Sequence, residues 1–168
     1  MRLLFQILCC CLLYLSLPAS ADTETEIIPK TEEAALQRAK DYAHAINYDF
    51  KEPEKIYAFL CSEFKEQMTE DLFIEAFNKE RSYPYITPLY IFYPEVTDKT
   101  DNTIYEVTFL QAARIEGMKY TIEMVYEDGN WFVRDWEQFL DGSYLDKFED
   151  IPYSLDWYYD FSGDNNGG

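Results

Sequence analysis

Few side chains in this sequence could carry acid–base or nucleophilic chemistry, and they are widely spaced. His44 is the only histidine, and an imidazole that titrates near neutral pH is a common general base. Its position falls off the apolar side of the helix predicted around it, so we expect His44 at the flank of that helix or exposed. We therefore interpret His44 as a solvated surface residue.

Asp135 is the candidate general base. In a strand predicted over residues 131–139, alternation places Asp135 and Glu137 on the same face as Trp131 and Val133. If that face lines an apolar cavity, desolvation raises the pKa of Asp135, as a general base requires. The alternative, which we favour, is that the strand leaves the core at Asp135 and that both acids are solvated.

Cys61 is the one cysteine outside the first 21 residues, so the chain without them forms no internal disulfide. A nucleophilic thiol needs a base and an electropositive setting, whereas the sequence neighbours of Cys61 include Glu54, Glu63 and Glu66. We interpret Cys61 as a buried structural thiol. A mixed or intermolecular disulfide stays open if the thiol is exposed.

The composition excludes several classes of function. The 168 residues include 32 acidic and 14 basic ones, a net charge of −18, so the chain should repel nucleic acid and anionic membranes. Histidine and cysteine do not cluster as in a zinc site, and the Asp-rich segments 98–102 and 156–164 lack the spacing of a calcium loop. We predict no metal and no cofactor. The acidity suits a cationic partner or simply keeps the protein soluble, and we favour solubility.

Residues 1–21 have the pattern of a secretory signal peptide. Arg2 precedes an apolar run over residues 3–17, and Ala19-Ser20-Ala21 matches a small-residue cleavage site. The run is shorter than the roughly 20 residues that cross a membrane, so we predict no membrane span. The sequence thus predicts cleavage after Ala21, a secreted or extracytoplasmic protein, and a flexible linker over residues 22–30.

Residues 103–139 predict three consecutive antiparallel strands, over 103–115, 118–127 and 131–139. They are rich in β-branched and aromatic residues, and the turn signals Glu116-Gly117 and Asp128-Gly129-Asn130 separate them. Alternation assigns one face of these strands to the core. That face carries Tyr105, Val107, Phe109, Tyr120, Ile122, Met124, Trp131 and Val133. The other face carries charged residues, and opposite charges there could pair across strands. These residues are Glu106, Arg114, Lys119, Glu123, Glu127 and Arg134.

Three N-terminal helices are predicted to cover the buried face. Thr31 caps the first, Pro53 opens the second and Thr69 caps the third. Their apolar stripes comprise Leu36, Ala39, Ala43, Ile46 and Phe50, then Ile56, Phe59, Leu60 and Phe64, then Leu72, Phe73, Ala76 and Phe77. A fourth strand over 89–93, flanked by prolines, is predicted at the sheet edge. The predicted fold class is α+β, with one domain over residues 31–140.

Residues 141–168 form an acidic, aromatic C-terminal tail whose end we expect to be disordered. Aromatic side chains anchor partner interfaces, and acids steer a chain towards basic surfaces. The candidates for such docking are Trp157, Tyr158, Tyr159 and Phe161. The alternative, which we favour, is that residues 144–161 fold back over the sheet and add to the core.

Three segments carry a resemblance to a known family: Lys55-Ile-Tyr-Ala-Phe-Leu60, Thr69-Glu-Asp-Leu-Phe73 and Asp128-Gly-Asn-Trp131. With the order of helices and strands, residues 33–139 resemble the NTF2-like superfamily, in particular small extracytoplasmic bacterial members and the N-terminal module of some penicillin-binding transpeptidases. The resemblance implies a curved sheet wrapped on helices as a cone, often with a ligand pocket at its open end. The lining would be Tyr105, Val107, Phe109, Gln111, Tyr120, Ile122, Trp131 and Asp135.

The resemblance also bears on activity and assembly. Family enzymes use His and Asp inside the cone, so the lack of a second histidine counts against an enzyme. Family members often dimerise through the sheet, which makes its outer face a candidate homodimer interface. The leading hypothesis is a secreted, non-catalytic domain that binds a small apolar ligand or a protein partner. The alternatives are a cofactor-free lyase or isomerase with Asp135 as general base, and an acidic inhibitor of a cationic extracellular enzyme.

Overall fold

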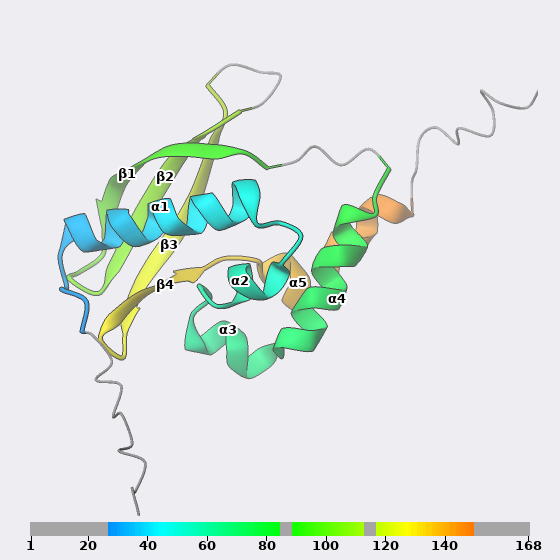
Figure 1. The fold of residues 1–168 in the computed structure, drawn as a ribbon, viewed down its shortest axis with the longest axis horizontal. Coiled ribbons are helices and arrows are strands. Elements are labelled where there is room, and N and C mark those ends of the chain that lie inside the picture. The colour runs from blue at the N-terminus through cyan, green and yellow to red at the C-terminus, as the bar shows by residue number, and fades with distance from the viewer. Residues whose placement is uncertain (1–26, 85–88, 113–116, 150–168) are drawn as a thin grey trace, which may run out of the picture.

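Helices followed by a four-stranded antiparallel sheet give the protein an α+β fold (Figure 1). The computed structural model describes residues 27–84, 89–112 and 117–149. The helices before the sheet are α1 (Glu32–Tyr48), α2 (Pro53–Tyr57), α3 (Ser62–Gln67) and α4 (Glu70–Arg81). The strands are β1 (Ile91–Lys99), β2 (Ile104–Gln111), β3 (Lys119–Glu127) and β4 (Asn130–Arg134). After the sheet come α5 (Glu137–Asp141) and the 3-10 helix η1 (Ser143–Phe148).

The sheet has the order β1-β2-β3-β4, so each strand pairs with its neighbour in sequence. The predicted hairpin between β3 and β4 is confirmed: Asp128 and Gly129 have φ values of +50° and +79°, as a two-residue turn of this kind requires. On the outer face, Arg134 forms a cross-strand ion pair with Glu123 at 2.8 Å, which is pairing of the kind predicted for the charges on this face. Both side chains are partly exposed, so the pair contributes at most about 1 kcal/mol.

The predicted buried face of the sheet forms the floor of the core. Seven of its residues are at most 6% exposed, namely Tyr105, Val107, Phe109, Ile122, Met124, Trp131 and Val133, and Tyr120 is partly buried. Helix α1 lies over this face, alongside β1 and in contact with β2 and β4 (Figure 1). Thr31 caps α1 as predicted, because its hydroxyl accepts a hydrogen bond from the Ala34 N–H at 3.3 Å.

The predicted second helix is in fact two short helices, α2 and α3. The segment between them pairs with β4: the Val133 N–H donates to the Phe59 carbonyl at 2.8 Å, and the Cys61 N–H donates to the Val133 carbonyl at 2.9 Å. These bonds satisfy backbone groups at the edge of β4 that a continuous helix would leave unpaired. The third predicted helix is α4, but Leu72 is 52% exposed and does not face inward, whereas Phe73 is fully buried.

The last strand ends at Arg134 rather than at Phe139. Trp136 adopts a left-handed conformation, with φ +71°, and turns the chain into α5. The buried Trp136 ring packs against Phe73, Phe77 and Phe139 at centroid distances of 5.9, 5.6 and 5.0 Å, and burial of that large ring outweighs continued strand pairing. Glu137 therefore lies exposed on α5 and does not share a strand face with Asp135.

The edge strand β1 is longer than the predicted segment 89–93 and runs through Pro94 to Lys99. Its edge position is as predicted, and proline is tolerated there because an edge strand needs fewer ladder hydrogen bonds. The pairing with β2 shifts register between Phe92 and Glu95, and again between Val96 and Asp98. Such β-bulges bend an edge strand and hinder its pairing with another chain.

Residues on both sides of the predicted domain 31–140 contact it. The Ile28 N–H donates to the Gly129 carbonyl at 2.8 Å, which joins the end of the predicted linker 22–30 to the β3–β4 hairpin. At the other end, Lys147 of η1 pairs with Glu80 of α4 at 2.5 Å. The predicted signal peptide, 1–21, and the docking candidates Trp157, Tyr158, Tyr159 and Phe161 lie outside the described residues.

Candidate functional sites

Asp135 lies at the centre of a hydrogen-bond cluster that joins α1, β3 and the β4–α5 turn. The Tyr42 hydroxyl of α1 donates to Asp135 Oδ2 at 3.2 Å, and the Tyr120 hydroxyl of β3 donates to the same oxygen. The Trp136 N–H donates to Asp135 Oδ1 at 2.8 Å, while the Trp136 indole N–H donates to the Tyr42 hydroxyl at 3.0 Å. The strand ends before Asp135 and Glu137 is exposed, as expected, but Asp135 is partly buried and hydrogen-bonded within the protein rather than solvated.

Burial sets the electrostatics of this cluster. Desolvation raises the pKa of Asp135, although the hydrogen bonds from Tyr120, Trp136 and Tyr42 oppose that rise. Desolvation also raises the pKa values of Tyr42 and Tyr120 well above their usual range, and the adjacent Asp135 carboxylate adds to both shifts. Both tyrosines therefore keep their protons and act as hydrogen-bond donors.

The cluster links α1, β3 and the β4–α5 turn. One of its residues, Asp135, also lines a surface depression. That depression has a volume of about 180 Å³ and is lined by Cys61, Glu63, Phe64, Gln67, Arg134, Asp135, Glu137 and Leu140. Asp135 already accepts three hydrogen bonds from its own chain, so few acceptor sites are left for a substrate proton. The geometry favours a structural role for Asp135 over catalysis.

The raised pKa predicts how Asp135 affects stability as the pH changes. The folded-state pKa lies above the unfolded value of about 3.9, so the folded chain binds more protons at this site. The contribution of Asp135 to the free energy of unfolding is then fully present below about pH 3.9 and is lost as pH rises through the folded-state pKa. Urea unfolding of the native chain and of Asp135→Asn at several pH values measures it. We expect the native chain to lose stability relative to Asp135→Asn as the pH rises through the folded-state pKa. A difference in the free energy of unfolding that does not change with pH would contradict this prediction.

Cys61 has the structural position expected for it. It is 1% exposed and precedes α3, next to the backbone pairing with Val133. A thiol this well covered cannot reach an external partner without local opening of the fold. The mixed or intermolecular disulfide left open above is therefore not supported.

The other residues predicted to line a ligand pocket fill the interior with side chains. The rings of Tyr105 and Trp131 lie 4.7 Å apart, and those of Phe109 and Tyr120 lie 6.4 Å apart. Val107 and Ile122 are 0% and 3% exposed and belong to the same apolar cluster. Gln111, at the end of β2, is partly buried. The described part of the predicted cone is thus packed as a core.

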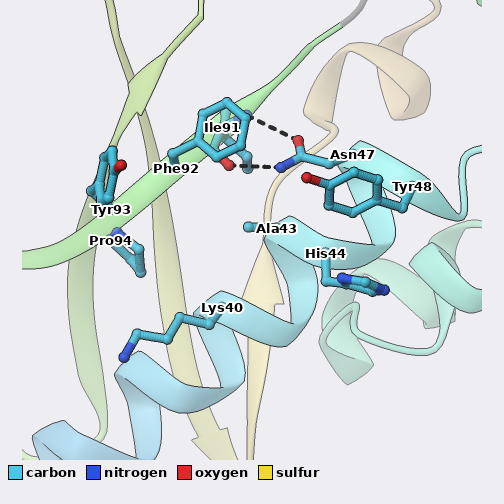
Figure 2. A pocket seen from close by; sticks show the side chains of 9 residues that line it. All are labelled: Lys40, Ala43, His44, Asn47, Tyr48, Ile91, Phe92, Tyr93 and Pro94. Atoms are coloured by element: carbon cyan, nitrogen blue, oxygen red, sulfur yellow. Dashed lines mark hydrogen bonds between the residues drawn. The ribbon is translucent and has the colours of Figure 1, made fainter.

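A groove on the outside of the molecule was not predicted. Lys40, Ala43, His44, Asn47 and Tyr48 of α1 and Ile91, Phe92, Tyr93 and Pro94 of β1 line it; we call it the α1–β1 groove (Figure 2). Its volume is about 210 Å³. The Asn47 side chain fixes its end, because it donates to the Ile91 carbonyl at 2.9 Å and accepts from the Ile91 N–H at 3.0 Å.

Aromatic rings on the two sides of the groove face solvent. Tyr93 and Pro94 stand on the β1 side, while Tyr48 and His44 stand on the α1 side (Figure 2). Tyr93 is 79% exposed and Tyr48 is 62% exposed, which is unusual for side chains of this size. The sequence signal that could have located the groove is the aromatic segment 90–93 before Pro94, at the edge strand.

Tyr93 also has a strained backbone, with φ +53° at the first bulge of β1. A non-glycine residue in the left-handed region costs about 1–2 kcal/mol, and such strain gathers at functional sites. We therefore predict that Tyr93→Gly raises the free energy of unfolding by about 1 kcal/mol. Chemical denaturation measures this. A decrease would show that the ring stabilises the fold by more than the backbone strain costs.

His44 lies between the α1–β1 groove and a second hollow on the other side of α1. This second hollow, which we call the α1–α2 depression, measures about 360 Å³ and is lined by Asp41, His44, Ala45, Asp49, Lys55, Ala58 and Phe59. The ring of His44 lies 5.0 Å from that of Tyr48. The expectation that His44 is exposed is confirmed.

Among the described residues, no group of three or more His, Cys, Asp or Glu side chains is arranged to hold a metal ion. None of the helices within those residues is long and apolar enough to cross a membrane. No model of a known protein family matches the chain, and comparison with curated proteins finds no match. The function proposed below therefore rests on the geometry of these surfaces.

Proposed function

We propose that the protein is a secreted, NTF2-like, non-catalytic domain that binds an extended segment of a partner protein across α1. The binding surface is the α1–β1 groove together with the α1–α2 depression. The observation that carries the proposal is the presentation of Tyr93, which is 79% exposed at a strained backbone position on the rim of a groove. The NTF2-like assignment is supported by the covering of one sheet face with helices and by the meander order of the strands.

The shape of the surface favours a protein segment over a small molecule. Small ligands are usually enclosed in one cavity of about 300–1,000 Å³ that buries most of their surface. Here the two hollows are open, and His44 lines both of them. A segment in extended conformation would place one side chain in each hollow and pass over His44. Exposed tyrosines suit such an interface because they offer large contact areas at little cost in conformational entropy.

The edge of β1 is not the proposed binding element. Pro94 has no N–H, the strand has two register shifts, and Asn47 already pairs with both backbone groups of Ile91. Addition of a peptide strand along this edge would meet each of these obstacles. Recognition should therefore use the side-chain surfaces of the hollows.

A peptide-display experiment tests the proposal. A library of random 12-residue peptides is selected on the full chain, and the affinity of the enriched peptides is measured for the native chain and for Tyr93→Ala. We expect enrichment of peptides that lose affinity for the variant. The proposal fails if no peptide is enriched, or if the enriched peptides bind both chains equally.

One observation favours a second candidate function, a cofactor-free lyase or isomerase: a largely buried acid, Asp135, borders the 180 Å³ depression. Proton abstraction next to a carbonyl would be visible by NMR as deuterium incorporation into small ketones and aldehydes in heavy water. Incorporation that disappears in Asp135→Asn would support this function. No incorporation with the native chain would remove it.

A further inference from the structure

Two positively charged side chains, Arg38 of α1 and Lys65 of α3, lie beside the α1–α2 depression. We propose that they form a carboxylate-binding site, which we call the Arg38–Lys65 site. Within the proposed function, this site holds an acidic group of the partner segment, so the inference rests on that function and names the chemistry of the partner. The supporting observations are the contacts of the two cations, their unused hydrogen-bond donors and their burial.

Arg38 lies where the segment between α2 and α3 pairs with β4. The Val133 N–H donates to the Phe59 carbonyl at 2.8 Å, which fixes the two stretches of backbone side by side. Arg38 contacts both of them. Its guanidinium carbon lies 4.1 Å from the ring centre of Phe59, and its Nε donates to the Trp131 carbonyl at 3.2 Å. Stacking on the ring and the hydrogen bond together hold the guanidinium in one place.

Lys65 contacts the same two stretches of backbone. Its Nζ donates to the Ala58 carbonyl at 3.3 Å and lies 5.3 Å from the ring centre of Phe132. Each of these partners is the sequence neighbour of a residue that Arg38 contacts. The two charged groups therefore lie over the same part of the surface.

Both cations keep hydrogen-bond donors that the described residues do not use. Arg38 donates one of its five N–H groups and Lys65 one of its three, both to backbone carbonyls. Within the described part of the chain, no carboxylate oxygen lies within 4 Å of either charged group, although the chain has 32 acidic residues. The remaining N–H groups can bind an acceptor that comes from outside.

Partial burial makes an anionic partner favourable at this place. Desolvation lowers the pKa values of Arg38 and Lys65, and the positive charge of Arg38 also lowers that of Lys65. Asp41 opposes the shift at Arg38, and Glu127 is the main charge that opposes it at Lys65. A bound carboxylate would compensate both desolvated charges, and its hydrogen bonds to them are roughly twice as strong as bonds between neutral groups.

Phe59 connects the Arg38–Lys65 site to the α1–α2 depression, because its ring lines the depression and also stacks on Arg38. Arg38 precedes Asp41 by three residues and Ala45 by seven, so it lies on the side of α1 that lines the depression. In an extended segment each residue spans about 3.3 Å. The next one or two residues of a segment that leaves the depression therefore reach the guanidinium, where an Asp or Glu side chain or the end of the chain supplies the carboxylate.

Two small probes test the site without any peptide. N-acetylphenylalanine carries a carboxylate beside an aromatic ring, whereas N-acetylphenylalanine amide lacks the charge. Each is titrated into ¹⁵N-labelled full chain, and the side-chain Nε–H signal of Arg38 is followed by NMR. We expect a saturable shift with the acid in the millimolar range and none with the amide. Equal shifts with both probes, or no shift with either, would overturn the proposal.

Side-chain variants supply the specificity control. Arg38→Gln and Lys65→Gln should each weaken binding of the acid about tenfold, as followed at the amide signal of Phe59. Arg81→Gln is the matched control: Arg81 is also partly buried, stacks on Phe50 at 4.2 Å and lines neither hollow. If Arg38→Gln fails to fold, Lys65→Gln still decides the outcome. Equal weakening by Lys65→Gln and Arg81→Gln would show a general charge effect and would contradict a specific site.

Peptides enriched by display identify the source of the carboxylate. We expect replacement of one Asp or Glu by its amide to weaken binding to the native chain about tenfold, with little effect on binding to Arg38→Gln. The same pattern on amidation of the peptide's end would assign the carboxylate to the chain terminus instead.

Failure of this inference is distinguishable from failure of the proposed function. Peptides that depend on Tyr93 but not on Arg38 would leave that function standing and remove the Arg38–Lys65 site from it. Binding of the acid probe at Arg38, with no peptide enriched, would remove the proposed function and leave the carboxylate-binding site standing.

Discussion

Phe73→Ala should lower the free energy of unfolding by about 3–5 kcal/mol, the range found when a buried phenylalanine is truncated. Phe73 is fully buried on α4 and is surrounded by rings of four other elements or turns. Its neighbours are Tyr57, Phe64, Phe77, Trp136 and Phe139, with centroids 5.5–6.0 Å away. Removal of the ring leaves a cavity that these rigid neighbours cannot close.

Urea unfolding measures this effect, and the adjacent residue is the matched control. Leu72 is 52% exposed, so Leu72→Ala should change stability by no more than about 0.5 kcal/mol. Equal losses in the two variants would contradict the orientation of α4 described here. An unchanged denaturant slope in Phe73→Ala would show that the comparison is between similar folded and unfolded states.

Tyr93→Ala and Tyr48→Ala should each weaken binding of a selected peptide by about 30-fold, the effect of losing roughly 2 kcal/mol at an interface hot spot. Both side chains are mostly exposed, so their removal should leave the fold intact. Isothermal titration calorimetry with one enriched peptide measures the affinities. The expected loss lies mainly in the dissociation rate, because interface truncations act there.

Tyr90→Ala is the matched control for these two variants. Tyr90 is 37% exposed and precedes β1, but it does not line the α1–β1 groove. It should leave the affinity within about threefold of native. If Tyr90→Ala weakened binding as much as Tyr93→Ala, the contact surface would not be the groove.

Local signals in the sequence predicted much of the fold. The Asp128-Gly129 turn, the alternation along β2 and β3, and the capping residues Thr31 and Thr69 all act over a few residues. These local signals agree with the tertiary structure, because the buried face of the sheet needs a cover of helices. The caps are confirmed by hydrogen bonds from Ala34 to Thr31 and from Leu72 to Thr69.

The differences arise where distant parts of the chain decide the outcome. The split between α2 and α3 results from pairing with Val133, more than 70 residues away in sequence. The end of β4 results from burial of Trp136 among the rings of α4 and α5. Neither contact lies within the short stretch of sequence over which periodicity is read. The sequence patterns therefore extend the predicted helix and strand past the ends that the structure shows.

The candidate sites also depend partly on local sequence signals and partly on contacts between distant residues. Alternation along the predicted last strand singled out Asp135, but its partner Tyr42 lies 93 residues earlier and just outside the predicted stripe of α1. The α1–β1 groove depends on a bulge that turns Tyr93 outward, and β-bulges have no reliable signature in a single sequence. Core residues could thus be predicted, whereas the exposed aromatic surface required the packing of α1 against β1.

The most direct test of the proposed function is an NMR map of peptide binding. ¹⁵N-labelled full chain is titrated with one peptide enriched by display, and shifts of the amide signals are followed residue by residue. We expect the largest shifts to cluster at Lys40, His44, Tyr48 and Tyr93, with smaller ones at Ala58 and Phe59 across α1. Shifts centred on Cys61, Arg134 and Asp135 would contradict it and would place the binding site at the depression beside the buried acid.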